Sequence, residues 1–214
     1  MKLILYYAPV TCALVPYVTL TEAAAEFEVI NLNTRANAHK TPQFLSLNPK
    51  HKVPVLVIDG KPLTENVALQ IWIARAFPQA KLLPAAPKAE INAISMLAWF
   101  SSTIHPHLTP NARPENYCDL PGSEESVKRA GNRMLFEDLL IADDRLAGRE
   151  WFFDHFTAVD AYFFWCFRRA LSFKLDVRAF TNCLALFERM QLRPSVQRVL
   201  AYEKAVQAEF ANAA

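Results

Sequence analysis

Hydrophobic and polar positions divide the chain into a mixed first part and a helical second part. In the first eighty residues, short runs that are continuously apolar or alternate with polar residues predict strands. These runs are residues 3–7, 28–33, 53–58 and 61–64. Asp59-Gly60 separates the last two and predicts a hairpin turn.

Helical spacing predicts helices between these strands, at residues 12–25, 38–48 and 66–77, the second one short and irregular. The order is therefore strand, helix, strand, helix, strand, strand, helix. Because helical crossovers join the first three strands, we expect those strands to be largely parallel, with a hairpin partner at one edge.

After Pro78 the strand pattern stops. We expect a first domain at 1–80, a linker rich in proline and alanine at 81–89, and an all-helical domain at 90–214. The predicted helices of the second domain are 91–108, 124–146, 157–174, 177–192 and 195–210. The fold class is thus α/β followed by all-α. Thr157 and Asp160 are spaced like a capping box at the start of one helix.

Composition excludes several classes of protein. The formal net charge is +2, which gives no electrostatic footprint for nucleic acid or an anionic membrane. The most aromatic stretch, residues 151–167, contains Asp154 and Asp160, so no clean membrane span is expected. The cysteines are widely spaced, at positions 12, 118, 166 and 183, which argues against a metal site and suits a reducing, cytoplasmic compartment.

Five segments resemble motifs of one family, in order and at its spacing. They are Tyr7–Cys12, Asn48–Leu56, Leu63–Ala68, Phe156–Tyr162 and Arg193–Gln197. Together they resemble the cytosolic glutathione transferases, nearest the bacterial beta class. The resemblance implies a thioredoxin-like, glutathione-binding domain followed by an all-helical domain that forms the electrophile side of the site.

The same resemblance implies a cytoplasmic homodimer that serves detoxification, with glutathione as co-substrate and no metal. The glutathione thiolate would attack a hydrophobic electrophile. Two alternatives stay open. One is a glutathione-dependent thiol reductase, lyase or isomerase on the same fold. The other is a binding or regulatory protein without catalysis.

The resemblance also assigns residues that bind glutathione. A cis Val53-Pro54 bond would present the backbone of Val53 to the cysteinyl backbone of the tripeptide. Glu65 would bind the γ-glutamyl amine. Asn66, at a helix start, would bind the γ-glutamyl carboxylate or simply cap the helix.

Two basic residues complete the predicted binding set. Arg35 falls where beta-class members often carry Lys and could pair with the glycine carboxylate, or could be a solvated surface residue. Lys52 precedes Val53, where Gln is common.

Three residues compete for contact with the glutathione sulfur. Cys12 opens the first predicted helix, whose dipole would favour a thiolate. Thr11 precedes it. Tyr7 ends the first strand, but Tyr6 and Tyr7 point to opposite sides, so at most one faces the site. We favour Cys12 and Thr11, while packing in the core remains the alternative for Tyr7 and Cys12.

In the helical domain, His105 matches a beta-class histidine that lines the site, with a structural role as the alternative. Trp99, Ser102, His107, Phe164 and Trp165 would help shape the electrophile pocket, although most aromatics at such spacing pack in the core. The sequence departs from the family at Val10, Ala13, Lys52, Asn66 and Ala98.

Overall fold

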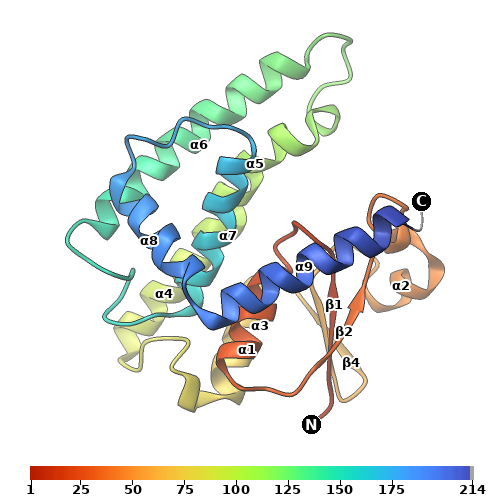
Figure 1. The fold of residues 1–214 in the computed structure, drawn as a ribbon, viewed down its shortest axis with the longest axis vertical. Coiled ribbons are helices and arrows are strands. Elements are labelled where there is room, and N and C mark those ends of the chain that lie inside the picture. Colours follow the sequence, from red (N-terminus) through yellow and green to blue (C-terminus); the bar gives the residue numbers. More distant parts are fainter. Residues whose placement is uncertain (213–214) are drawn as a thin grey trace. The chain divides into compact units, whose positions relative to one another are not determined.

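A computed structural model describes residues 1–212, and its contacts divide the chain into two compact units (Figure 1). The N-terminal unit contains Met1–Ala85 together with the segment from Gln191 onward. The helical unit contains Ala86–Met190. The segment from Gln191 onward thus groups with the strands, whereas sequence reasoning placed it in the helical domain.

A four-stranded sheet of order β2-β1-β3-β4 forms the centre of the N-terminal unit. The strands are β1 (Leu3–Tyr7), β2 (Glu28–Asn31), β3 (Val55–Ile58) and β4 (Lys61–Thr64). β1 pairs with β2 in parallel, but β3 is antiparallel to both β1 and β4. The hairpin prediction is confirmed, while the prediction that the first three strands are largely parallel is wrong for β3.

The reason lies in the connection between β2 and β3. A parallel crossover must return the chain to the opposite end of the sheet. Here the chain contains only a 3-10 turn, Ala38–Lys40, and the six-residue helix α2 (Pro42–Leu47). It re-enters the sheet at the end where β2 stopped, so β3 runs the other way.

Both faces of the sheet are covered. Phe44 of α2 packs with Val55 and Val57 on one face. The helices α1 (Leu14–Glu22) and α3 (Asn66–Ala76) lie on the other face (Figure 1). A 3-10 turn, Pro78–Ala80, follows α3.

The last helix, α9 (Pro194–Asn212), packs against α1. Arg193 forms an ion pair with Glu22 at 2.7 Å, and Ser195 hydrogen-bonds to the same carboxylate. This pair is about three-quarters or more buried, so it fixes the start of α9 more firmly than a surface pair would. These contacts explain why α9 groups with the sheet.

The helical unit is built around α7 (Ala158–Ser172), most of whose side chains are buried. The other elements are α4 (Pro87–Trp99), a π-helical turn (Phe100–Ile104), α5 (His105–Ala112), a 3-10 turn (Pro114–Asn116), α6 (Glu124–Leu146) and α8 (Thr181–Gln191). The predicted helix at 91–108 therefore contains a wide turn. Pro106 lacks an N–H, and widening the preceding turn accommodates its ring.

The predicted capping box at the start of α7 is confirmed. The Thr157 hydroxyl accepts from the backbone N–H of Val159, and the Asp160 carboxylate accepts from the N–H of Thr157 at 2.7 Å. Asp160 also accepts from the N–H of Phe152 at 3.0 Å. Burial raises the pKa of Asp160 to about 6, although these hydrogen bonds act in the opposite direction.

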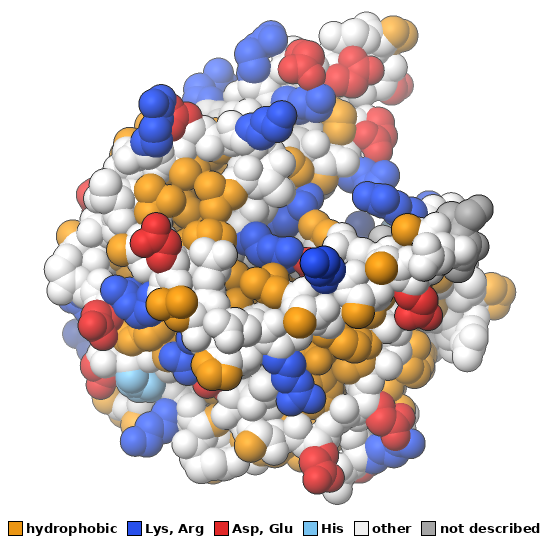
Figure 2. All heavy atoms as spheres, viewed as in Figure 1, with side chains coloured by type: hydrophobic (Ala, Val, Ile, Leu, Met, Phe, Trp, Pro, Cys, Tyr) orange, Lys and Arg blue, Asp and Glu red, His pale blue; other side chains and the backbone are white. Residues whose placement is uncertain are grey.

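Charged and apolar side chains are mixed on the molecular surface. On the face drawn in Figure 2, basic, acidic and apolar side chains are interspersed. No helix within residues 1–212 is long and apolar enough to cross a membrane. Within the same residues, no group of three or more His, Cys, Asp or Glu side chains could hold a metal ion.

Replacing Asp160 tests the capping box. Asp160→Asn sets an amide NH₂ against backbone donors, so we expect it to lower the free energy of unfolding by about 2–3 kcal/mol in urea titrations. Asp154→Asn, at an exposed neighbour, should change it by less than about 0.5 kcal/mol.

The same variant tests the raised pKa. A raised pKa of an acid gives stability that is complete below about pH 4 and lost as the pH rises to about 6. The stability difference between parent and Asp160→Asn should therefore shrink over that window. A difference that grows with pH would contradict the assignment.

Candidate functional site

Among the described residues of the N-terminal unit, seven other than glycine have φ angles in the left-handed region, and three of them lie in turns that carry predicted site residues. Val10, His51 and Glu65 have φ angles of 69°, 48° and 72°, in the left-handed region that favours glycine. Such strained residues cluster at functional sites. Val10 follows β1, His51 precedes β3 and Glu65 lies between β4 and α3. We call residues 9–12, 50–54 and 64–66 together the three-turn site.

Hydrogen bonds hold these turns together. The Cys12 thiol donates to the carbonyl of Val53, with a sulfur-to-oxygen distance of 3.7 Å. The amide nitrogen of Asn66 donates to the carbonyl of Cys12 at 3.0 Å. The predicted cis Val53-Pro54 bond is present. The structure therefore brings together Cys12, Val53, Pro54 and Asn66, which sequence reasoning had placed in one site.

Asn66 does not cap its helix. It is the first residue of α3, and its amide oxygen accepts from Gln70 at 2.9 Å. With its amide turned inward to Cys12 and Gln70, Asn66 offers a ligand its backbone N–H rather than its side chain. Gln70 is fully buried and was missed from sequence; only its spacing of four from Asn66 on one helix face could have indicated it.

Glu65 lies at the exposed rim of the site. Its carboxylate forms an ion pair with Lys50, whose ammonium also donates to the Thr64 hydroxyl at 2.8 Å. Both side chains are at least half exposed, so the pair contributes little to stability and can open to a ligand. Lys50 was missed as a site residue, although it lies in the segment that resembles the family.

Cys12 is a neutral thiol. Burial raises its pKa to about 12, more than the Asn66 amide and the Lys52 charge lower it. The expectation that the helix start favours a Cys12 thiolate is therefore wrong, because the side chain is only 8% exposed. Its proton makes Cys12 a hydrogen-bond donor.

Alkylation tests the state of Cys12 against Cys118 of the same chain. A hydrogen bond from Ser123 lowers the pKa of Cys118, which is also more exposed than Cys12. At pH 8 we expect iodoacetamide to label Cys118 at least about 100-fold faster than Cys12, measured by peptide mass spectrometry. In urea the two rates should converge. Equal rates in the folded protein would contradict a neutral, buried Cys12.

Tyr7 belongs to the core rather than to the surface of the site. It is fully buried, and its hydroxyl donates to the Glu203 carboxylate of α9 at 3.0 Å. Tyr6 packs on the opposite face, against Phe44. Glu203 also accepts from the backbone N–H of Val10 at 2.6 Å. The sequence analysis missed Glu203, because the only signal for it in the sequence was its position within an otherwise amphipathic helix.

Replacing Glu203 tests this contact. Both donors bond to Oε2 of Glu203, so in Glu203→Gln the amide oxygen can take that place but accepts without the negative charge. Because hydrogen bonds to a charged group are the stronger ones, we expect a loss of about 2 kcal/mol in the free energy of unfolding and weaker ligand binding at the three-turn site. Tyr7→Phe should cost about 1 kcal/mol. Glu209→Gln, exposed on the same helix, should have no effect. Equal effects of the two glutamate variants would contradict the assignment.

The remaining predicted residues of this unit differ in position. Thr11 donates its hydroxyl proton to the carbonyl of Ala8 at 2.7 Å and accepts from the N–H of Ala13. The side chain of Lys52 is exposed, and its charge acts on Cys12. Arg35 is exposed, and among the described residues its side chain has no hydrogen bond or ion pair to the three-turn site.

His105 lies in the helical unit. A ring nitrogen lies 3.4 Å from the Tyr162 hydroxyl, and its ring packs edge-on against Trp165, with centroids 4.5 Å apart. Its neighbour His107 pairs with Asp138 of α6 at 2.6 Å. Phe164 and Trp165 are buried, at 1% and 4% exposure, so they form core. The roles of His105 and Trp99 toward a ligand stay predictions.

Comparison with known proteins agrees with this geometry. Residues 1–75 match the family model described as glutathione S-transferase, N-terminal domain. The glutathione S-transferase GST-4.5 of Xanthomonas campestris pv. campestris is 31% identical to the chain, over 93% of this chain and 98% of that protein.

Solved structures are also similar. A sphingomonad glutathione S-transferase complexed with glutathione has a TM-score of 0.82 and 28% identity, covering 94% of this chain and 98% of its own. The bacterial beta class enzyme of Sphingomonas chungbukensis gives 0.82 and 29%, with the same coverage. The thioredoxin-like unit and the helical unit are thus those of a known fold.

Proposed function

Since this chain belongs to the glutathione S-transferase family, we propose that it binds glutathione at the three-turn site and transfers the glutathione thiolate to hydrophobic electrophiles. The observation that carries the proposal is the convergence of Cys12, Val53 and Glu65 on turns joined by hydrogen bonds. The glutathione bound in similar structures supports the ligand.

Each end of the tripeptide has a partner in this proposal. The cysteinyl backbone pairs with the backbone N–H and carbonyl of Val53, like an added strand. Glu65 binds the γ-glutamyl amine, and the N–H groups at the start of α3 bind the γ-glutamyl carboxylate. Arg35 and Lys52 supply positive charge for the glycine carboxylate.

The sulfur is stabilised by donors rather than by a charged cysteine. When the glutathione amide occupies the Val53 carbonyl, the Cys12 S–H turns toward the glutathione sulfur. The Thr11 hydroxyl, once released from the carbonyl of Ala8, adds a second donor, and the dipole of α1 favours the negative charge. The thiol proton leaves to solvent, the thiolate forms a bond to carbon, and the leaving group departs with its electron pair.

Burial of Cys12 favours conjugation over disulfide exchange. With its pKa raised to about 12 by burial, Cys12 is a neutral thiol at pH 7 and so a poor nucleophile. We further propose that His105 contacts the electrophile. We also propose that the enzyme is a cytoplasmic homodimer of the beta class that serves detoxification.

Calorimetry with glutathione and a conjugation assay on an aryl halide test the proposal. Glu65→Gln should weaken glutathione binding about ten-fold, because it removes the charged partner of the amine. Glu28→Gln is the matched control. It is equally exposed, at 63% against 66%, and also paired with a lysine. No binding of millimolar glutathione by the parent would overturn the proposal.

Cys12→Ala separates conjugation from disulfide exchange. We expect conjugation to fall about ten-fold but to persist, since Cys12 supplies one donor among several. A parent that reduces glutathione mixed disulfides, with all of this activity lost in Cys12→Ala, would instead establish the thiol reductase. Conjugation absent from both proteins, with glutathione bound, would establish a binding protein.

A further inference from the structure

A buried glutamine lies beneath the three-turn site with half of its amide unpaired. Gln70 belongs to α3 and is fully buried. Its amide nitrogen donates to the Asn66 amide oxygen at 2.9 Å, whereas its own amide oxygen has no hydrogen-bond partner within residues 1–212. An unpaired polar atom in the interior costs stability, and an apolar side chain of the same length would avoid that cost. Stability alone therefore does not explain an amide at this position.

The orientation of both amides follows from one carbonyl. The backbone carbonyl of Cys12 can only accept, so Asn66 turns its NH₂ toward it, at 3.0 Å. The Asn66 oxygen then faces the other way and needs a donor. Gln70 supplies that donor with its own NH₂. The unpaired oxygen of Gln70 is thus the consequence of holding Asn66 in this orientation.

The orientation of Asn66 acts on the Cys12 thiol. Burial raises the pKa of this thiol, and a hydrogen bond from the Asn66 amide acts in the opposite direction. An NH₂ group donates and cannot accept, so the Cys12 S–H keeps the Val53 carbonyl as its acceptor. If the Asn66 amide turned over, its oxygen would accept from the S–H and draw the thiol proton away from the ligand.

We propose that Gln70 is a positioning residue for the glutathione sulfur, on which it acts through the Asn66 amide and the Cys12 S–H. This inference rests on the proposed function. Gln70 holds the donors of Asn66 toward Cys12, so the S–H stays available to the glutathione sulfur once the tripeptide occupies the Val53 carbonyl. Because Gln70 is fully buried, its effect should appear in the ionisation of bound glutathione rather than in affinity.

Gln70→Met tests the proposal, because it keeps the length of the side chain and removes the donor. We expect the ionised fraction of bound glutathione at pH 7, read from thiolate absorbance, to fall about five-fold, and kcat for conjugation to fall equally. The KM for glutathione should change less than about two-fold. In the Asn66→Ala background the same substitution should change neither the ionised fraction nor kcat, since Gln70 acts through Asn66.

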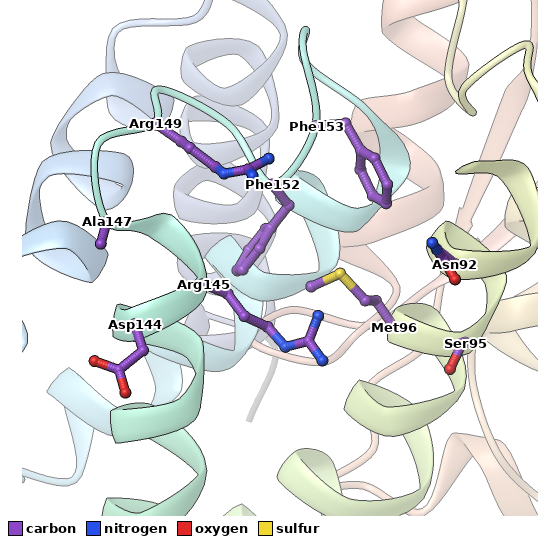
Figure 3. Close-up of a pocket in the computed structure, with 9 residues that line it drawn as sticks. All are labelled: Asn92, Ser95, Met96, Asp144, Arg145, Ala147, Arg149, Phe152 and Phe153. Carbon is purple, nitrogen blue, oxygen red and sulfur yellow. The ribbon is translucent and has the colours of Figure 1, made fainter. Parts of the chain in front are cut away.

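Two control variants separate this effect from a general loss of polar groups. Thr19→Val removes a fully buried hydroxyl of α1, which donates to the carbonyl of Val15 at 3.2 Å. Asn92→Leu removes an amide from α4 in the helical unit, where Asn92 lines a cavity that shares no residue with the three-turn site (Figure 3). Neither variant should change the ionisation of bound glutathione.

Two results would overturn this inference and leave the proposed function in place. One is a Gln70→Met protein that ionises bound glutathione as the parent does. The other is an equal loss with and without the Asn66 side chain, because Gln70 would then act through the packing of α3. A parent that binds no glutathione would overturn the proposed function, and this inference with it.

Discussion

The site depends on the hydrogen bonds of the Glu203 carboxylate, which is buried beneath the corner between β1 and α1. It accepts from the N–H of Val10 and from the hydroxyl of Tyr7, and so joins the last helix to the turn that leads to Cys12. A β-branched residue in the left-handed region costs about 1–2 kcal/mol. Val10 has a φ of 69°, and the bond to Glu203 helps to offset that cost.

This contact also explains why α9 groups with the sheet although it is nearly two hundred residues away in sequence. Arg193 and Glu22 fix the start of the helix, and Glu203 fixes its middle. The turn at Val10, part of the three-turn site, is therefore held by residues far apart in the sequence. Changes in α9 are expected to reach the site without touching a ligand.

Much of the architecture follows from the sequence, because the strands and helices have clear hydrophobic periods. The hairpin at Asp59-Gly60 and the capping box at Thr157 depend on residues next to one another, so local patterns reveal them. The predicted direction of β3 was wrong, because this direction depends on the end of the sheet at which the chain re-enters after β2. The sequence analysis missed Glu203 because its partners are set by the tertiary fold. It missed Gln70 because the contact of Gln70 with Asn66 lies buried under the site. The predicted charge state of Cys12 was wrong, because burial raises the pKa of its thiol and this effect outweighs that of the helix start.

A neutral Cys12 changes what the site does to a thiol. In the proposed reaction it would donate a hydrogen bond to the glutathione sulfur rather than attack a disulfide, which fits the transfer of the glutathione thiolate to carbon. The most direct measurement is a crystal structure with glutathione bound. We predict the glutathione sulfur within hydrogen-bonding distance of Cys12 or Thr11, with the cysteinyl backbone paired to Val53. A tripeptide bound elsewhere, or a disulfide between its sulfur and Cys12, would contradict this account.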